Sequence, residues 1–236
     1  MVALRDGIDD APAADAVTPA GDPGSRRRRA AALAGHRGDE AAARAFGADP
    51  EPGVRATALA ALARMGRATG ADLRRGLTDP DALVRRRACE VAGQLGGVGG
   101  AGGAGAASPA PTAVEGLVGC LADGEAAVVE AAAWALGEHG AGAARPPVLD
   151  GLGAVATSHA DALCREAAVA ALGAVGDRRG LPAILAATRD RPAVRRRAVL
   201  ALAPFDGPEV LRALECARLD RDWQVRQAAE DLLEES

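Results

Sequence analysis

The sequence lacks lysine, asparagine and tyrosine altogether, and aromatic residues make up only 2% of its 236 positions. All 28 basic residues are therefore arginine. The missing residue types have AT-rich codons, so their absence is typical of a bacterial genome rich in GC. The arginine clusters are therefore weak evidence for phosphate binding by themselves. The formal net charge of −4 also disfavours a generally basic nucleic-acid binder.

Long apolar runs and a secretory leader are missing too. No stretch of about 18 consecutive apolar residues occurs, so no membrane span is expected. Asp6, Asp9 and Asp10 occupy the region where a signal peptide would need basic residues. These features predict a cytoplasmic protein.

Motifs for catalysis or cofactor binding are absent as well. The glycine-rich stretch at 97–107 lacks the Lys-Ser or Lys-Thr of a phosphate-binding loop, and no nucleophile elbow or metal-ligand spacing occurs. We therefore predict no catalytic, cofactor or metal site. The cysteines form no Cys-x-x-Cys pair and are interpreted as buried free thiols rather than disulfide partners: Cys89, Cys120, Cys164 and Cys216.

What the sequence does contain is a short phrase that returns six times at intervals of 30 to 44 residues. Position four of the phrase is Ala in all six copies, and position eight is Leu in five. A period of this length, with small and apolar residues in fixed places, is typical of stacked helical hairpins. The first residues of the copies, taken as position zero, are Val54, Val84, Val128, Cys164, Val194 and Val225.

Helix boundary signals recur with the same period. An acidic residue lies three places before position zero in five copies, where it can accept hydrogen bonds from the free amides of a helix start. Pro52 and Pro192 follow at the next place, where a missing amide costs nothing. In the third copy we expect helices at 112–121 and 125–139. Glycines twelve places after position zero are predicted to close helices in a left-handed conformation: Gly66, Gly96, Gly140 and Gly176.

Four segments depart from the regular pattern. Residues 1–24 are rich in Ala, Pro, Gly and Asp and are predicted to be a disordered tail. A degenerate copy follows from Ser25, aligned through Leu33, and is expected to form a capping helix. Residues 97–113 are interpreted as a flexible insertion, either a loop, which we prefer, or a hinge between two sub-arrays. Glu230 stands where other copies have apolar or small residues, so 230–235 is predicted to be a polar cap.

Arg follows position zero in five copies, and Asp lies five places before it in four. The composite phrase, as in residues 79–88, resembles the HEAT repeat, specifically its short phycobilisome-lyase-like variety, over residues 25–236. The resemblance implies an all-α, right-handed α-solenoid of about six helical hairpins plus a degenerate N-terminal cap, with the second helices lining a concave face. It also implies a ladder of ion pairs between neighbouring units, built from Asp49, Arg55, Asp79, Arg85, Asp123, Arg165, Arg195, Asp220 and Arg226.

Some HEAT-like proteins are enzymes, and the residues of this chain limit each comparison. Nothing identifies a site for a bilin, the group that the lyases attach. Deoxyhypusine hydroxylases hold two irons with His-Glu pairs, whereas His36, His139 and His159 are the only histidines here and none is followed by Glu. HEAT-like DNA glycosylases use aromatic, acidic and Arg residues, which Trp134 and the arginines partly match.

The exposed stripe of each second helix should consist of positions three, six and ten, because positions zero, four, seven and eight face inward. In the third unit this stripe runs through Ala131, Trp134 and Glu138. Trp134 is either an interface hot spot or a filler over an Ala-rich neighbouring helix. Trp223 is interpreted as a lid over the terminal apolar end, and His159, in place of a ladder Asp, as a turn residue. The predicted partner-binding residues are Arg64, Arg87, Glu90, Gln94, Trp134, Glu138 and Arg197.

The leading hypothesis is a non-catalytic scaffold, monomeric and without cofactor, that binds a protein partner on its concave face. The alternative is nucleic-acid binding through Trp134 and the triplets 85–87 and 195–197, which could instead be solvated surface paired with acids. A third, lower-ranked hypothesis is an enzyme or enzyme accessory of the lyase-like or hydroxylase-like branch.

Overall fold

The computed structural model describes residues 22–96 and 111–234, and in these ranges it contains thirteen α-helices, two short 3-10 helices and no strand. The 3-10 helices cover Gly140–Ala143 and Arg178–Gly180. The α-helices are α1 (Pro23–Arg37), α2 (Glu40–Phe46), α3 (Pro52–Arg64), α4 (Gly70–Leu77), α5 (Ala82–Gly96), α6 (Pro111–Cys120), α7 (Ala126–Glu138), α8 (Pro146–Ser158), α9 (Ala162–Val175), α10 (Leu181–Ala187), α11 (Pro192–Ala201), α12 (Pro208–Ala217) and α13 (Trp223–Glu234).

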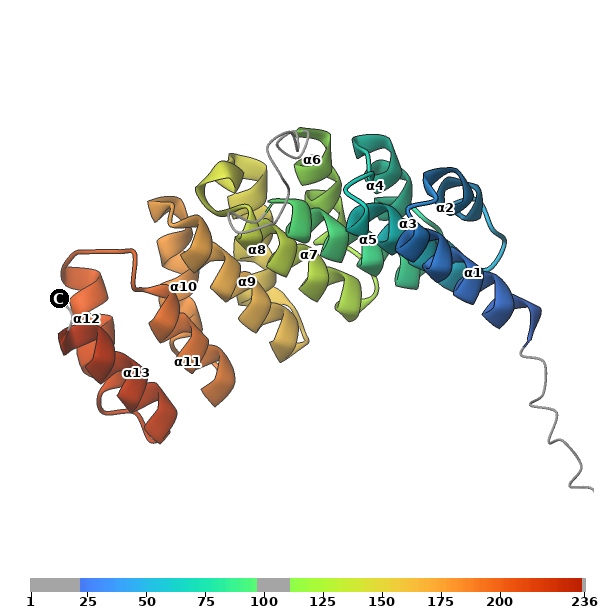
Figure 1. Ribbon diagram of the computed structural model, residues 1–236. Helices are drawn as coiled ribbons and strands as arrows, with labels where there is room; N and C mark the ends of the chain where they lie inside the picture. The colour runs from blue at the N-terminus through green and yellow to red at the C-terminus, as the bar shows by residue number, and fades with distance from the viewer. Residues whose placement is uncertain (1–21, 97–110, 235–236) are drawn as a thin grey trace, which may run out of the picture.

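The helices form a bent array of two rows. The odd-numbered helices from α1 to α13 pack side by side in chain order, and each even-numbered helix packs against the odd-numbered helix that follows it. Figure 1 shows α1 and α13 at opposite ends, with the even-numbered helices along the outer, convex side. Six hairpins, from α2–α3 to α12–α13, thus follow the single helix α1. The prediction of an all-α, right-handed α-solenoid with an N-terminal cap is confirmed.

The boundary signals act largely as predicted. Asp81, Asp161 and Asp222 each accept a hydrogen bond from the amide two residues later, all at 2.9 Å. Glu51 and Glu125 occupy the same place but make no such bond. Gly66, Gly140 and Gly176 have φ of 66°, 51° and 68°, the left-handed conformation that L side chains disfavour. Gly96 is different, because it is still helical and is the last residue of α5.

The inner row is held together by small residues at the helix contacts. All six alanines at position four are completely buried. At position nine, a Cβ on Gly93, Gly137 or Gly173 would lie about 3 Å from the Cα atom of an alanine in the next inner helix. The missing side chains therefore let neighbouring helices approach closely, which strengthens their dispersion contacts.

Two of the segments that were predicted to be irregular end earlier than predicted. Pro23–Gly24 already belong to α1, whose first turn is capped by Asp22, and Pro111 opens α6. Helix therefore begins before the predicted ends of the tail (1–24) and of the insertion (97–113). The rest of both segments lies outside the described residues.

Four side chains differ from the prediction in their exposure. Leu33 is 39% exposed while its neighbour Ala34 is buried, so the capping helix is rotated by about one residue from the predicted alignment. Cys216 is exposed, whereas the other three cysteines are buried free thiols. Ala131 is buried, although it was placed on the exposed stripe. Trp223 is 64% exposed and so is not a lid.

Candidate interaction surface

Ion pairs join most neighbouring units through one repeated arrangement. Arg55 donates from Nε and Nη2 to the two carboxylate oxygens of Asp79, at 2.8 and 2.7 Å, and its Nη1 binds the carbonyl oxygen of Asp49. The pairs Arg85–Asp123, Arg165–Asp190 and Arg195–Asp220 have the same bidentate geometry. Such pairs fix both distance and orientation, so the ladder sets how one unit sits on the next.

One rung is missing, between the third and fourth units. Val129 stands where the other units have Arg, and His159 stands where they have Asp. His159 Nδ1 accepts a hydrogen bond from the amide of Asp161 at 3.1 Å, the bond that the ladder aspartates accept in their own turns. His159 is thus a turn residue, and both partners of the rung are replaced together.

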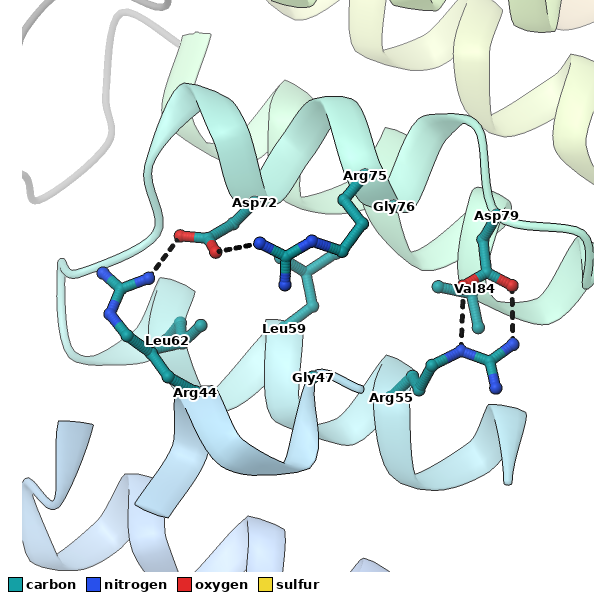
Figure 2. Close-up of a pocket in the computed structure, with 10 residues that line it drawn as sticks. All are labelled: Arg44, Gly47, Arg55, Leu59, Leu62, Asp72, Arg75, Gly76, Asp79 and Val84. Carbon is teal, nitrogen blue, oxygen red and sulfur yellow. Dashed lines mark hydrogen bonds and ion pairs between the residues drawn. The ribbon is translucent and has the colours of Figure 1, made fainter. Parts of the chain in front are cut away.

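The hollow in Figure 2 lies among the ion pairs of the first two units. It is bounded by Arg55–Asp79 on one side and by Arg44–Asp72 on the other, with Leu59 on its wall. Its volume is about 30 Å³, which is room for about one water molecule. This hollow is therefore part of the packing between units and is too small for a ligand.

Two larger hollows lie along the inner row and meet at Trp134. The α5–α7 hollow, of about 310 Å³, is lined by Glu90, Gln94 and Trp134 among others. The α7–α9 hollow, of about 390 Å³, is lined by Trp134, Glu138 and, from α11, Arg197. Glu130 and Trp134 line both. Together the two hollows form a surface that crosses four inner helices, which we call the concave groove.

The ring of Trp134 covers Gly93 of the preceding inner helix. A Cβ at Gly93 would lie 2.6 Å from Cζ3 of the ring, so the indole occupies space that the glycine leaves free. Trp134 is nevertheless 41% exposed. Part of the ring is thus packed and part is open to solvent. The packed part fits the prediction of a filler, and the open part fits the prediction of an interface residue.

The charges of the groove are only partly compensated. Glu90 pairs with Arg86 at 3.0 Å and with Arg87 at 2.6 Å. Glu166 pairs with Arg197 at 3.3 Å. Over the described residues, no ion pair or side-chain hydrogen bond involves the two other carboxylates of the groove, Glu130 and Glu138. Glu130 and Glu138 therefore lack an ion-pair partner among these residues, one on each side of Trp134 on α7, whereas Glu90 is shared by two arginines.

Comparison with known proteins decides the family. The pattern of HEAT repeats matches residues 41–137 and 149–234. The chain belongs to the HEAT-repeat family. No curated protein matches its sequence.

Several solved structures are similar to this HEAT-repeat protein in fold. The complex of CpcE and CpcF of phycocyanin lyase from Nostoc sp. PCC7120 has 21% identity and a TM-score of 0.56, covering 97% of this chain and 81% of that one. An engineered protein reaches a TM-score of 0.60 at 19% identity, covering 83% and 97%. A designed armadillo repeat protein in complex with the peptide (KR)4 reaches 0.55 at 16% identity, covering 90% and 99%. At these identities the likeness shows the fold alone.

The groove brings together most of the residues predicted to bind a partner. Glu90 and Gln94 meet Trp134 in one hollow, and Glu138 and Arg197 meet it in the other. Arg64 and Arg87 line neither hollow. Arg64 instead lies beside Gly35 of α1, and Arg87 reaches the groove only through its ion pair with Glu90.

Sequence reasoning missed several groove and ladder residues. Glu130 and Leu163 line the groove but lie outside positions three, six and ten. The signal for Glu130 was its place four residues before Trp134, which puts both on one helix face. Arg27 and Asp190 are ladder residues as well, pairing with Asp49 and Arg165 at 2.8 and 2.6 Å.

Outside the groove, ion pairs and burial shift the pKa values of several titratable groups. The guanidinium of Arg85 lowers the pKa of Asp123 from its ordinary value, and that of Arg195 does the same for Asp220. Burial lowers the pKa of His139, whose Nε2 has no hydrogen-bond partner among the described residues. The described ranges hold no group of three or more His, Cys, Asp or Glu placed to bind a metal ion. They also hold no helix that could span a membrane.

Proposed function

We propose that this HEAT-repeat protein is a non-catalytic scaffold that binds a segment of a partner protein in its concave groove, with Trp134 as the central contact. The observation that carries this proposal is the position of Trp134, which is half open to solvent and shared by two adjoining hollows. A large aromatic side chain at the centre of a groove is typical of an interface hot spot. As part of the same proposal we keep the expectations of a monomeric, cytoplasmic protein.

The rigidity of the inner row supports this role. The helices on both sides of the groove are fixed by buried alanines and by close glycine contacts, so the groove exists before a partner arrives. A preformed surface loses little conformational entropy on binding, which leaves more of the contact energy for affinity.

The engaged arginines argue against the nucleic-acid alternative. In the triplet 85–87 each arginine is paired with a carboxylate, and in the triplet 195–197 the first and last are. Glu130 and Glu138 would face any phosphate that entered the groove and would repel it. If nucleic acid did bind, its affinity would fall steeply as salt rises.

The experiment compares partner capture by wild type, Trp134→Ala and Trp223→Ala. Trp223 is also exposed but lies outside the groove, which makes it a matched control. We expect proteins from a native lysate to be retained by wild type and by Trp223→Ala, and lost with Trp134→Ala under conditions in which circular dichroism shows that this variant is folded. Retention of the same proteins by Trp134→Ala would overturn the proposal, and a lowered melting temperature in that variant would then assign Trp134 a packing role.

A further inference from the structure

Resting on the function proposed above, we infer that the partner segment inserts a cationic side chain, an arginine or a lysine, between Glu130 and Glu138, where it lies on the open face of the Trp134 indole. A bulky apolar residue about three positions away occupies the neighbouring α7–α9 hollow. The occupant is therefore a basic and apolar protein segment rather than an acidic one.

The geometry of α7 places the two carboxylates symmetrically about the indole. Glu130 lies four residues before Trp134 and Glu138 four residues after it, so all three project from one face of the helix. At a rise of about 1.5 Å per residue, the Cα atoms of the two glutamates are separated by about 12 Å along the axis. A segment that crosses α7 between them passes directly over the ring.

The charges determine the sign of the side chain that the ring receives. Glu90 is paired with two arginines and Glu166 with one, whereas Glu130 and Glu138 are the groove carboxylates that have no ion pair in the part of the chain that the structure describes. The face of an indole attracts a cation through its quadrupole. The ring packs beside Gly93 at Cζ3 and is 41% exposed, so a cation can reach the part of the ring that stays open to solvent.

The lining of the α7–α9 hollow determines the type of partner residue that follows the cationic one. The hollow is lined by alanines at 167, 170, 171 and 174 and by Leu163, which is 58% exposed. Packed helices lie about 10 Å apart, and an extended chain advances about 3.3 Å per residue. A segment running from the ring into this hollow therefore places its apolar side chain about three residues from the cation.

The test uses Trp134 as its own probe. The chain has two tryptophans, so Trp223→Phe leaves Trp134 as the only one. The probes are three synthetic peptides, acetyl-Gly-Ser-X-Gly-Ser-Leu-Ser-Gly-amide with X as Arg, Gln or Glu, titrated to millimolar concentration. We expect the Arg peptide to shift the emission of Trp134, the Gln peptide to bind at least about tenfold more weakly, and the Glu peptide to have no effect.

A second experiment removes the two negative charges of the groove with little change in side-chain shape and repeats the peptide titrations. Glu130→Gln with Glu138→Gln should abolish the preference for the Arg peptide. Glu115→Gln with Glu215→Gln, at exposed positions on the outer helices α6 and α12, should leave it intact.

The outcomes separate this inference from the proposed function. Equal binding of the three peptides, preference for the Glu peptide, or a response to a short oligonucleotide in their place would overturn the cationic occupant. A silent Trp134 with every peptide would overturn it as well. The proposed function fails separately, when partner capture is unaffected by Trp134→Ala.

Discussion

Replacing Arg195 by alanine should loosen the last helical hairpin, whereas replacing Arg226 should not. Both arginines follow position zero, and both donate from Nη1 to backbone carbonyl oxygens of the preceding turn. Only Arg195 continues the ladder, with bonds of 2.8 and 2.7 Å from Nε and Nη2 to the carboxylate of Asp220. No carboxylate pairs with Arg226 among the described residues. The two substitutions are therefore matched except for the rung.

The expected cost follows from how far the pair is removed from water. The side chains of Arg195 and Asp220 are only 8% and 15% exposed. Removing one partner of a buried ion pair costs about 3–5 kcal/mol. Asp220 still accepts a bond from the amide of Asp222 and retains some contact with water, so we expect about 2–3 kcal/mol. For Arg226→Ala the loss of carbonyl bonds alone predicts about 1 kcal/mol or less.

Hydrogen exchange measures this effect locally, which matters because repeat arrays need not unfold as one unit. We expect Arg195→Ala to speed exchange in α12 and α13 and to leave α3–α5 unchanged. The loss of stability in Arg195→Ala relative to wild type should reach its full size above about pH 4. The reason is that the carboxyl group of Asp220 has a pKa near 3.8 in the unfolded chain and a lower pKa in the folded protein. This loss should shrink as the pH falls further. If Arg195→Ala destabilises α12 and α13 no more than Arg226→Ala does, the Arg195–Asp220 ion pair does not stabilise the last hairpin.

Three further predictions concern packing, the missing rung and pH. Gly173→Ala should lower the free energy of unfolding by about 1–3 kcal/mol, because its Cβ would lie 2.8 Å from Cα of Ala201. Gly119→Ala, where the Cβ would enter open space, should be neutral or stabilising. Urea denaturation measures both, and equal effects would contradict the close approach of α9 and α11 at Gly173. Val129→Arg and His159→Asp should each destabilise alone but couple favourably by about 1–3 kcal/mol in a double-mutant cycle, and additive losses would refute the rebuilt rung. His139 has a folded pKa below its ordinary 6.5, so the unfolded chain binds more protons. Stability should therefore fall as the pH drops from about 7 to 5, and a slope that persists in His139→Phe would assign the effect to another group.

The helical pairs and their contacts could be predicted because the same residues recur in the same places. Alanine at position four and the acidic helix starts depend on local geometry and on one neighbouring helix, both of which the repeat fixes. For the same reason, the sequence could place five residues of the groove on one surface: Trp134, Glu90, Gln94, Glu138 and Arg197. The repeat period alone places these residues on one face.

The remaining features depend on small shifts that the period does not record. Asp190 lies four residues before position zero rather than five, yet it still reaches Arg165. Only one residue separates Asp190 from the start of α11, whereas two residues separate the other ladder aspartates from the helices that follow them. The capping helix is rotated, so Leu33 is exposed and Arg27 joins the ladder. Trp223 is the first residue of α13 and is 64% exposed.

Hydroxyl-radical footprinting of the complex with a captured partner tests the central claim most directly, because it reports each exposed side chain separately. Trp134 and Leu163 lie in the concave groove, whereas Leu211, Leu219 and Trp223 lie outside it and are each more exposed than Trp134. We predict that the partner protects Trp134 and Leu163 from oxidation and leaves the other three at the rate of the free protein. Protection of Leu211, Leu219 and Trp223 with an unprotected Trp134 would contradict binding in the groove.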